Sequence, residues 1–373
     1  MKGRKIFSVI KKISMLVLVT ACVDKIDFDI PNTDPLIVVE GMITSDPGPY
    51  TVRVSRSIGF DSDSSFRDPI EAMKIKLFDD QGNQEDFTET KPGVYSTGGA
   101  IAGAVGHSYH IRLETSDGKI FESQPDTLHA VGEVTNVKHA YQHEVLHKNY
   151  GDIDNNFFNI SIDADAGTES NNYVRWKFTG IYKMVTRPEL HETFLTASSY
   201  KTPLPCSGWE VLPALGGGLL SQFGECTCCV CWIYDYESTP HLSDEQLVVN
   251  HAFKDVPVGT VSINSYTFSD KYLIRIDQMS LSKSAFRFFN LLRAQREGAS
   301  SLFQPPSAQI TGNITPINSN EKVVGLFWAS SVNTKLTYLL PSDIPYLVPP
   351  PEEIDDTCRV LHNSTTEQPS FWQ

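Results

Sequence analysis

The chain has 373 residues, with 31 Lys and Arg against 45 Asp and Glu, so its formal net charge is −14 at pH 7. An acidic surface repels phosphate backbones and anionic lipid headgroups, which argues against nucleic-acid binding and against electrostatic docking on a membrane. A chain of this length exceeds the size at which one hydrophobic core stops growing, so we expect two domains.

Residues 1–21 have the three parts of a secretory signal peptide. Residues 1–12 carry five positive charges and no acidic residue, and residues 13–19 form an apolar run too short to cross a bilayer. The ending Val-Thr-Ala-Cys resembles the bacterial lipobox, in which the bond before the cysteine is cut and the cysteine is acylated. We therefore predict that Cys22 begins the mature chain and attaches it to the membrane through lipid. Removal of the signal leaves 26 basic against 45 acidic residues.

The next segments predict a tether and a β-domain. Residues 22–35 are acidic and contain two prolines, as expected for a tether. Over residues 36–125, short alternating segments are separated by turn signals such as Asp117-Gly118, which predicts an antiparallel β-sandwich of the immunoglobulin-like or carboxypeptidase-regulatory-like type. The expected strands are 36–41, 50–55, 73–78, 93–96, 107–115 and 119–123.

Residues 130–340 predict a second antiparallel β-sandwich domain, so the fold class is mainly β. The expected strands begin at 134–137 and continue with 157–162, 173–182, 258–264, 272–279, 309–315 and 323–331. One amphipathic helix is expected over 282–297, because Ser282 is a suitable N-cap and apolar residues recur every three or four positions from Ala285 to Leu292. Residues 341–373, rich in proline and acid, predict an extended tail.

Six cysteines remain once Cys22 is acylated, and four of them lie close together. An even number in an exported chain favours disulfides, although the spacing Cys226…Cys229 and Cys228…Cys231 also suits zinc. Adjacent Cys228 and Cys229 point in opposite directions in an extended chain, so they should bridge different partners and staple an insertion at 200–232 to the domain. We predict disulfides and no metal, with the fifteen pairings left open. The candidates are Cys206, Cys226, Cys228, Cys229, Cys231 and Cys358.

Several other patterns are weaker. Asp152-Ile-Asp-Asn-Asn has calcium-like spacing but lacks the downstream Gly and Glu of an EF-hand, so a solvated turn is preferred; Asp61/Asp63 and Asp163/Asp165 are weaker still. On a helix, the three histidines His139, His143 and His147 would share one face, where two of them could hold a metal. The neighbouring sequence lacks the Glu of a zincin, and a helix is not assured there, so we expect structural or exposed histidines. The aromatic residues Trp209, Trp232 and Tyr234 either form a binding platform or cover the insertion's own small core.

The chain carries none of the short motifs that would name an enzyme. It has no Gly-x-Ser-x-Gly elbow, no phosphate-binding loop and no dinucleotide fingerprint. We nominate no catalytic residue and no cofactor, and we expect a non-enzymatic protein.

Seven segments of the chain together form a recognisable pattern. They are Cys22-Val-Asp-Lys-Ile-Asp-Phe-Asp-Ile-Pro, Leu36-Ile-Val-Val-Glu-Gly-Met-Ile-Thr, Pro47-Gly-Pro-Tyr-Thr-Val-Arg-Val-Ser-Arg-Ser, residues 106–119, Asn172-Tyr-Val-Arg-Trp, residues 278–286 and Gly325-Leu-Phe-Trp-Ala-Ser-Ser-Val. These segments resemble a family of Bacteroidota proteins known as domain of unknown function 4249, and the resemblance covers most of the chain from Cys22 to about Val332. Members of that family are outer-membrane lipoproteins, often encoded beside TonB-dependent transporters, and acidic residues near Cys22 resemble a surface-export signal.

The resemblance implies an accessory or ligand-presenting subunit for nutrient uptake. We expect it to be lipid-anchored in the outer membrane, to face the cell exterior and to associate with a TonB-dependent β-barrel transporter. Its ligand is not identified by the sequence. An envelope structural or adhesion protein and a surface hydrolase are the alternative functions, because a fold alone does not decide between them.

Overall fold

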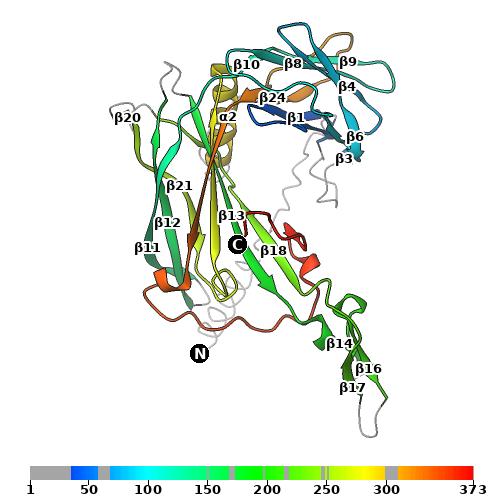
Figure 1. The fold of residues 1–373 in the computed structure, drawn as a ribbon, viewed down its shortest axis with the longest axis vertical. Coiled ribbons are helices and arrows are strands. Elements are labelled where there is room, and N and C mark those ends of the chain that lie inside the picture. The colour runs from blue at the N-terminus through cyan, green and yellow to red at the C-terminus, as the bar shows by residue number, and fades with distance from the viewer. Residues whose placement is uncertain are drawn as a thin grey trace, which may run out of the picture.

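The computed structural model describes residues 35–57, 68–148, 151–167, 173–195, 198–213, 218–244, 248–249, 252–298 and 310–372. It is mainly β, as predicted, and the described part contains one α-helix. Figure 1 shows two groups of sheets, with a narrow arm projecting from the second. No helix in these ranges is both long and apolar enough to cross a bilayer.

Two sheets form the first group, which we call the first sheet pair. Sheet 1 has the order β24 (Val323–Ser330), β1 (Ile37–Thr44), β2 (Thr51–Arg56), β7 (Val94–Ser96) and β6 (Thr88–Lys91), with β3 (Asp68–Pro69) on β2. Sheet 2 has the order β23 (Ile314–Pro316), β9 (Ile120–Ser123), β8 (Ser108–Glu114), β4 (Lys74–Asp79) and β5 (Gln84–Asp86), with β10 (Asp126–Thr127) on β8.

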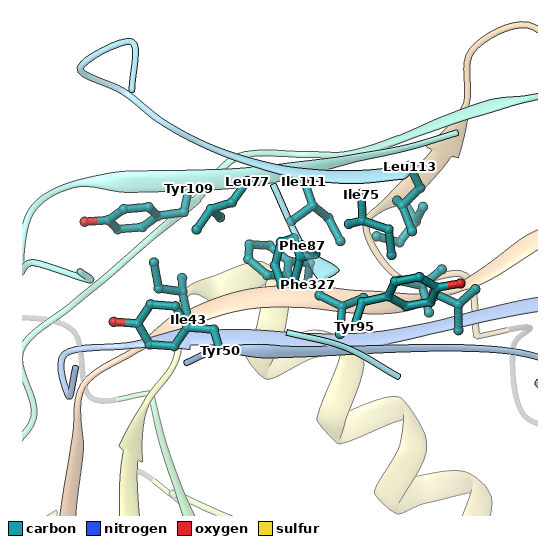
Figure 2. Packing of buried hydrophobic residues seen from close by; sticks show 14 of the residues in the cluster. Ile43, Tyr50, Ile75, Leu77, Phe87, Tyr95, Tyr109, Ile111, Leu113 and Phe327 are labelled. Atoms are coloured by element: carbon teal, nitrogen blue, oxygen red, sulfur yellow. The ribbon is translucent and has the colours of Figure 1, made fainter. Parts of the chain in front are cut away.

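The core of the first sheet pair lies between its two sheets, as Figure 2 shows. Ile43 and Tyr50 point inward from sheet 1, and Ile75 and Ile111 point inward from sheet 2. The alternation that predicted these strands therefore reflects one buried and one outward face on each.

Two strands of this pair come from the far end of the chain. β24 runs parallel to β1 over its full length, from Ile37 opposite Val323 to Thr44 opposite Ser330, and β23 pairs with β9. The sequence pattern assigns both segments to the second domain, because it shows that they are strands but not which strand they pair with. Gly325 permits the close approach: its φ is +143°, and a Cβ there would collide with the carbonyl oxygen of Val39.

The second sheet pair encloses another core. Sheet 3 has the order β11 (Val134–Lys148), β12 (Gly151–Asp165), β21 (Ala252–Ser262) and β20 (Val248–Val249). Sheet 4 has the order β25 (Val332–Leu339), β22 (Tyr272–Ser280), β13 (Val174–Val185), β18 (Val230–Tyr236) and β26 (Ser364–Thr365), with β19 (His241–Leu242) on β13. Trp176 lies at the centre of this core, fully buried, and its indole N–H donates to Gln278 Oε1 at 2.8 Å.

Helix α2 (Lys283–Gly298) joins the two sheet pairs. The predicted cap is present, since the Ala285 amide donates to Ser282 Oγ at 3.1 Å. Ala285 and Phe289 on the buried face of the helix pack with Leu326 and Trp328 of β24, on the side of sheet 1 away from its own core. The helix therefore covers an outer sheet face, as the apolar periodicity predicted, and it fixes one sheet pair on the other.

Two further parts complete the described structure. The arm comprises the hairpins β14 (Glu192–Leu195) with β15 (Ser198–Lys201) and β16 (Trp209–Leu212) with β17 (Leu219–Gln222). The C-terminal segment crosses the end of the second sheet pair and returns along sheet 4, where Thr365 pairs with Trp232. The predicted tail is thus a structural part of sheet 4.

Candidate functional site

Six cysteines form three disulfides at the base of the arm. The bonds join Cys206 to Cys228, Cys226 to Cys229 and Cys231 to Cys358. Adjacent Cys228 and Cys229 have different partners, as the geometry of an extended chain predicted. Because all six sulfurs are bonded in pairs, this structure supports the disulfide alternative over the zinc alternative. The cluster fixes both the arm and the C-terminal segment to the end of β18.

The three spaced histidines lie on a strand, and the helical alternative is wrong. His139, His143 and His147 share one face of β11, but successive members are about 13 Å apart at the usual rise per residue of a strand. His143 Nε2 lies 3.1 Å from Asp154 Oδ1, and His147 Nδ1 lies 2.7 Å from Asp152 Oδ1. At this spacing the histidines are too far apart to share a ligand, and His143 and His147 each contact an aspartate of the neighbouring strand instead.

The cross-strand contacts of Asp152 and Asp154 with these histidines account for the calcium-like spacing of the acidic residues. Asp152 and Asp154 lie in β12, opposite β11, and not in a solvated turn. Asp163 accepts from Lys138 Nζ at 2.8 Å and from the Asp255 amide at 3.1 Å, and the Lys138 contact lowers the pKa of Asp163. Within the described ranges, no group of three or more His, Cys, Asp or Glu side chains is arranged to hold a metal ion.

Two residue sets named from the sequence fall outside the described residues. They are the lipid attachment residue Cys22, which stays a prediction, and the weak acidic pattern at Asp61 and Asp63, for which no site was predicted.

The aromatic residues near the arm do not form one platform. Trp232 is buried and lies edge-on to Trp372, with ring centroids 6.5 Å apart, in a small cluster on the outer face of sheet 4. Tyr234 stacks on Tyr236 at 5.9 Å, and Trp209 lies in β16 of the arm. Neighbouring strands of sheet 4, with Ile181 and Leu273, and the C-terminal segment, with Trp372, supply the rest of this small core, and the insertion does not.

A groove between the two sheet pairs is the feature that the sequence did not reveal. We call it the basic groove, because four cations and two carboxylates line a hollow of about 600 Å³ that adjoins a second of about 370 Å³. Its charged residues are Glu40, Arg53, Arg175, Lys177, Glu237 and Arg296.

Strand alternation explains why these cations face one space. Arg53 lies between the buried residues Val52 and Val54 of β2, so its side chain leaves sheet 1 on the face away from the core. Arg175 and Lys177 alternate in the same way with buried residues of β13. The outward faces of two strands from different sheets thus border one groove.

Arg175 is the fixed member of the groove. Its Nη2 lies 2.5 Å from Glu237 Oε1, and its guanidinium lies 4.4 Å above the ring of Phe289. Glu237 Oε2 also accepts from the Phe178 amide at 2.9 Å. Because this ion pair is largely buried, Arg175 has a structural role in the wall of the groove, and its charge is already neutralised by Glu237.

The other three groove cations make no ion pair with described residues. They are Arg53 on β2, Lys177 on β13 and Arg296 in the last turn of α2. Trp328 lines the smaller hollow, and its buried indole N–H has no hydrogen-bond partner within the described structure. The groove therefore has hydrogen-bond donors and positive charge in excess.

A polar hollow of about 770 Å³ lies beside the basic groove. The two share the segment from Tyr236 to Thr239, and the polar hollow adds hydroxyl and amide side chains of sheet 3, such as Asn159 and Thr260. Burial lowers the pKa of His241 at its wall, so this imidazole is neutral at pH 7. These groups are suited to hydrogen bonding with a ligand.

The arm exposes apolar side chains away from the body. Leu219 is 64% exposed and Phe223 62% exposed, and Tyr200, Val211 and Leu212 are also exposed. The sequence from Val211 to Gln222 contains no charged residue. A projecting apolar surface of this kind is typical of a protein interaction site.

Comparison with known proteins gives a family. A family model described as Domain of unknown function (DUF4249) matches residues 23–336. No curated protein matches the chain significantly.

Proposed function

The chain belongs to the family called domain of unknown function 4249, and on that premise we propose that it is a non-enzymatic, lipid-anchored accessory protein of the outer membrane. It would face the cell exterior and present ligand to a TonB-dependent β-barrel transporter. The lipobox-like ending at Cys22 supports the anchor, because two or more acyl chains hold a protein stably on a membrane.

The observation that carries the proposal is the arm. Two-stranded hairpins are only marginally stable alone, yet the Cys206–Cys228 disulfide and the Thr227 amide, which donates to the Cys206 oxygen at 2.9 Å, hold the arm beside the start of β18. A fixed arm that exposes Leu219 and Phe223 is a surface for a partner, since exposed apolar side chains without a structural task favour association.

Co-purification tests this function. The native protein, solubilised from membranes in mild detergent, should carry a β-barrel transporter with it, and the paired change Leu219→Ser and Phe223→Ser should remove most of that partner. Leu347→Ser is the matched control, because Leu347 is 93% exposed but lies in the C-terminal segment.

Two results would count against the proposal. If the unaltered protein purifies without any barrel, the proposed transporter partner is wrong. If the arm variant retains the barrel, the arm is not its docking surface. Intact-mass measurement of the native N-terminus tests the anchor separately, because Cys22 should be the first residue and should carry acyl chains.

A further inference from the structure

We propose that the basic groove binds a ligand that carries an oxyanion, such as a carboxylate, sulfate or phosphate group. This inference deepens the proposed ligand-presenting function and rests on it. The two fail separately, because groove binding is measured on the protein alone and partner association is measured on the native complex.

The charge of the groove favours an anionic ligand. The groove gathers Arg53, Arg175, Lys177 and Arg296 around Glu40 and Glu237, an excess of positive charge in a chain whose net charge is −14. Like charges repel one another and cost stability, so a local excess of cations against the overall sign favours an anion between them.

Geometry is the second argument. Arg53 comes from sheet 1, Lys177 from sheet 4 and Arg296 from α2, so the three cations approach the groove from different elements. Apolar side chains of α2 pack with Trp328 in one buried cluster, and this packing fixes the sheets and the helix relative to one another. A preformed site of this kind loses little conformational freedom when its ligand binds.

The chemistry of the donors indicates the ligand class. A guanidinium presents parallel N–H groups that match the two oxygens of a carboxylate, sulfate or phosphate, while a lysine ammonium adds a mobile point charge. Arg175 is already engaged by Glu237, so it serves as a positioning residue, and Arg53, Lys177 and Arg296 are the binding residues.

The adjoining polar hollow sets the size of the ligand. It shares Tyr236, Glu237, Ser238 and Thr239 with the basic groove, and its other walls carry hydroxyl and amide groups. With volumes of about 600 and 770 Å³, the two hollows lie in the range of ordinary ligand pockets. A ligand with an acidic group in the basic groove and a neutral polar body in the polar hollow fits this arrangement.

Calorimetric titration of the full chain, purified in a zwitterionic detergent, tests the inference. The probes are inorganic phosphate, inorganic sulfate, citrate and trigalacturonate, with neutral maltotriose as the uncharged comparison. At least one oxyanion probe should bind more tightly than maltotriose, and its affinity should fall as salt is added, because ions screen exposed charges. The probe that binds best distinguishes a free inorganic anion from a carboxylate on a larger molecule.

Matched variants assign the binding to the groove. Arg53→Gln and Lys177→Gln should each weaken binding about tenfold, the effect of one lost charge-assisted hydrogen bond. Lys335→Gln is the control, because Lys335 is exposed on the same sheet and alternates to the opposite face from Lys177. It should leave affinity unchanged. The inference is wrong if no oxyanion probe binds, or if the double variant Arg53→Gln/Lys177→Gln binds as tightly as the unaltered protein.

Discussion

The arm and the sheet pairs of this molecule are held in place by different physical means. Each sheet pair encloses a continuous set of buried apolar side chains, whereas the described arm contributes no member to any of the large buried clusters. Instead, Cys206–Cys228 and Cys226–Cys229 close its base. A segment that is cross-linked at its base is free to leave apolar side chains in solvent, because its position does not depend on burying them.

The Cys231–Cys358 bond should give the largest effect, because it serves the body and not the arm. It spans 127 residues, and in the chain-entropy description closing a loop of that length raises the free energy of the unfolded chain by about 4–5 kcal/mol. The double change Cys231→Ala/Cys358→Ala should therefore lower the free energy of unfolding by up to that amount, as measured in denaturant. An unchanged midpoint would mean that other C-terminal contacts suffice.

Trp176→Ala should cost about 3–5 kcal/mol, because it empties the centre of the second core and leaves Gln278 without its indole partner. Val211→Ala on the arm is the comparison and should change the free energy of unfolding by less than about 0.5 kcal/mol, since Val211 is exposed. Similar losses for the two variants would show that the arm and the second core unfold as one unit.

Removal of the Cys206–Cys228 bond should loosen the arm alone. Its 22-residue separation predicts a contribution of about 3 kcal/mol, confined to the segment that the bond closes. The change Cys206→Ala/Cys228→Ala should expose the hairpin of β16 and β17, which lies inside that loop, to protease while the main unfolding transition stays within a few degrees of its original temperature. A large fall in that temperature would contradict the separation of arm and body.

The smallest effect should come from Asp163→Asn in sheet 3. The contact with Lys138 lowers the pKa of Asp163 below its ordinary value, so its stabilising effect is present above about pH 4 and is lost as the pH falls through the lowered pKa. The variant should be slightly less stable at pH 7, and the difference should close in acid. Thermal unfolding across pH 2–7 measures this, and a difference that grows in acid would contradict the assignment.

The sequence predicted the elements better than their partners. Alternation in β2 and β8 and the apolar periodicity of α2 are local, so each was found within one or two residues of its observed bounds. The parallel pairing of β1 with β24 joins residues nearly 290 positions apart, and no local pattern encodes it. The number of cysteines predicted disulfides, but six cysteines allow fifteen pairings.

The basic groove, like the strand pairing, could not be predicted from local sequence patterns. Arg53, Lys177 and Arg296 each read as an ordinary solvent-facing residue of its own element, and only the packing of α2 on β24 brings them around one space. The histidines of β11 show another limit of sequence patterns, because a spacing of four residues places side chains on one face of a helix and of a strand alike. The period alone therefore left the element type open.

The parallel pairing of β1 and β24 has a consequence for biogenesis. β1, the first strand of the described residues, finds one of its two neighbours only when residues 323–330 arrive, so sheet 1 stays open at that edge while most of the chain is still being made. An open edge invites pairing with the wrong chain. We therefore expect nascent copies to depend on a holding chaperone until synthesis is nearly complete, and truncated copies that end before β24 to aggregate.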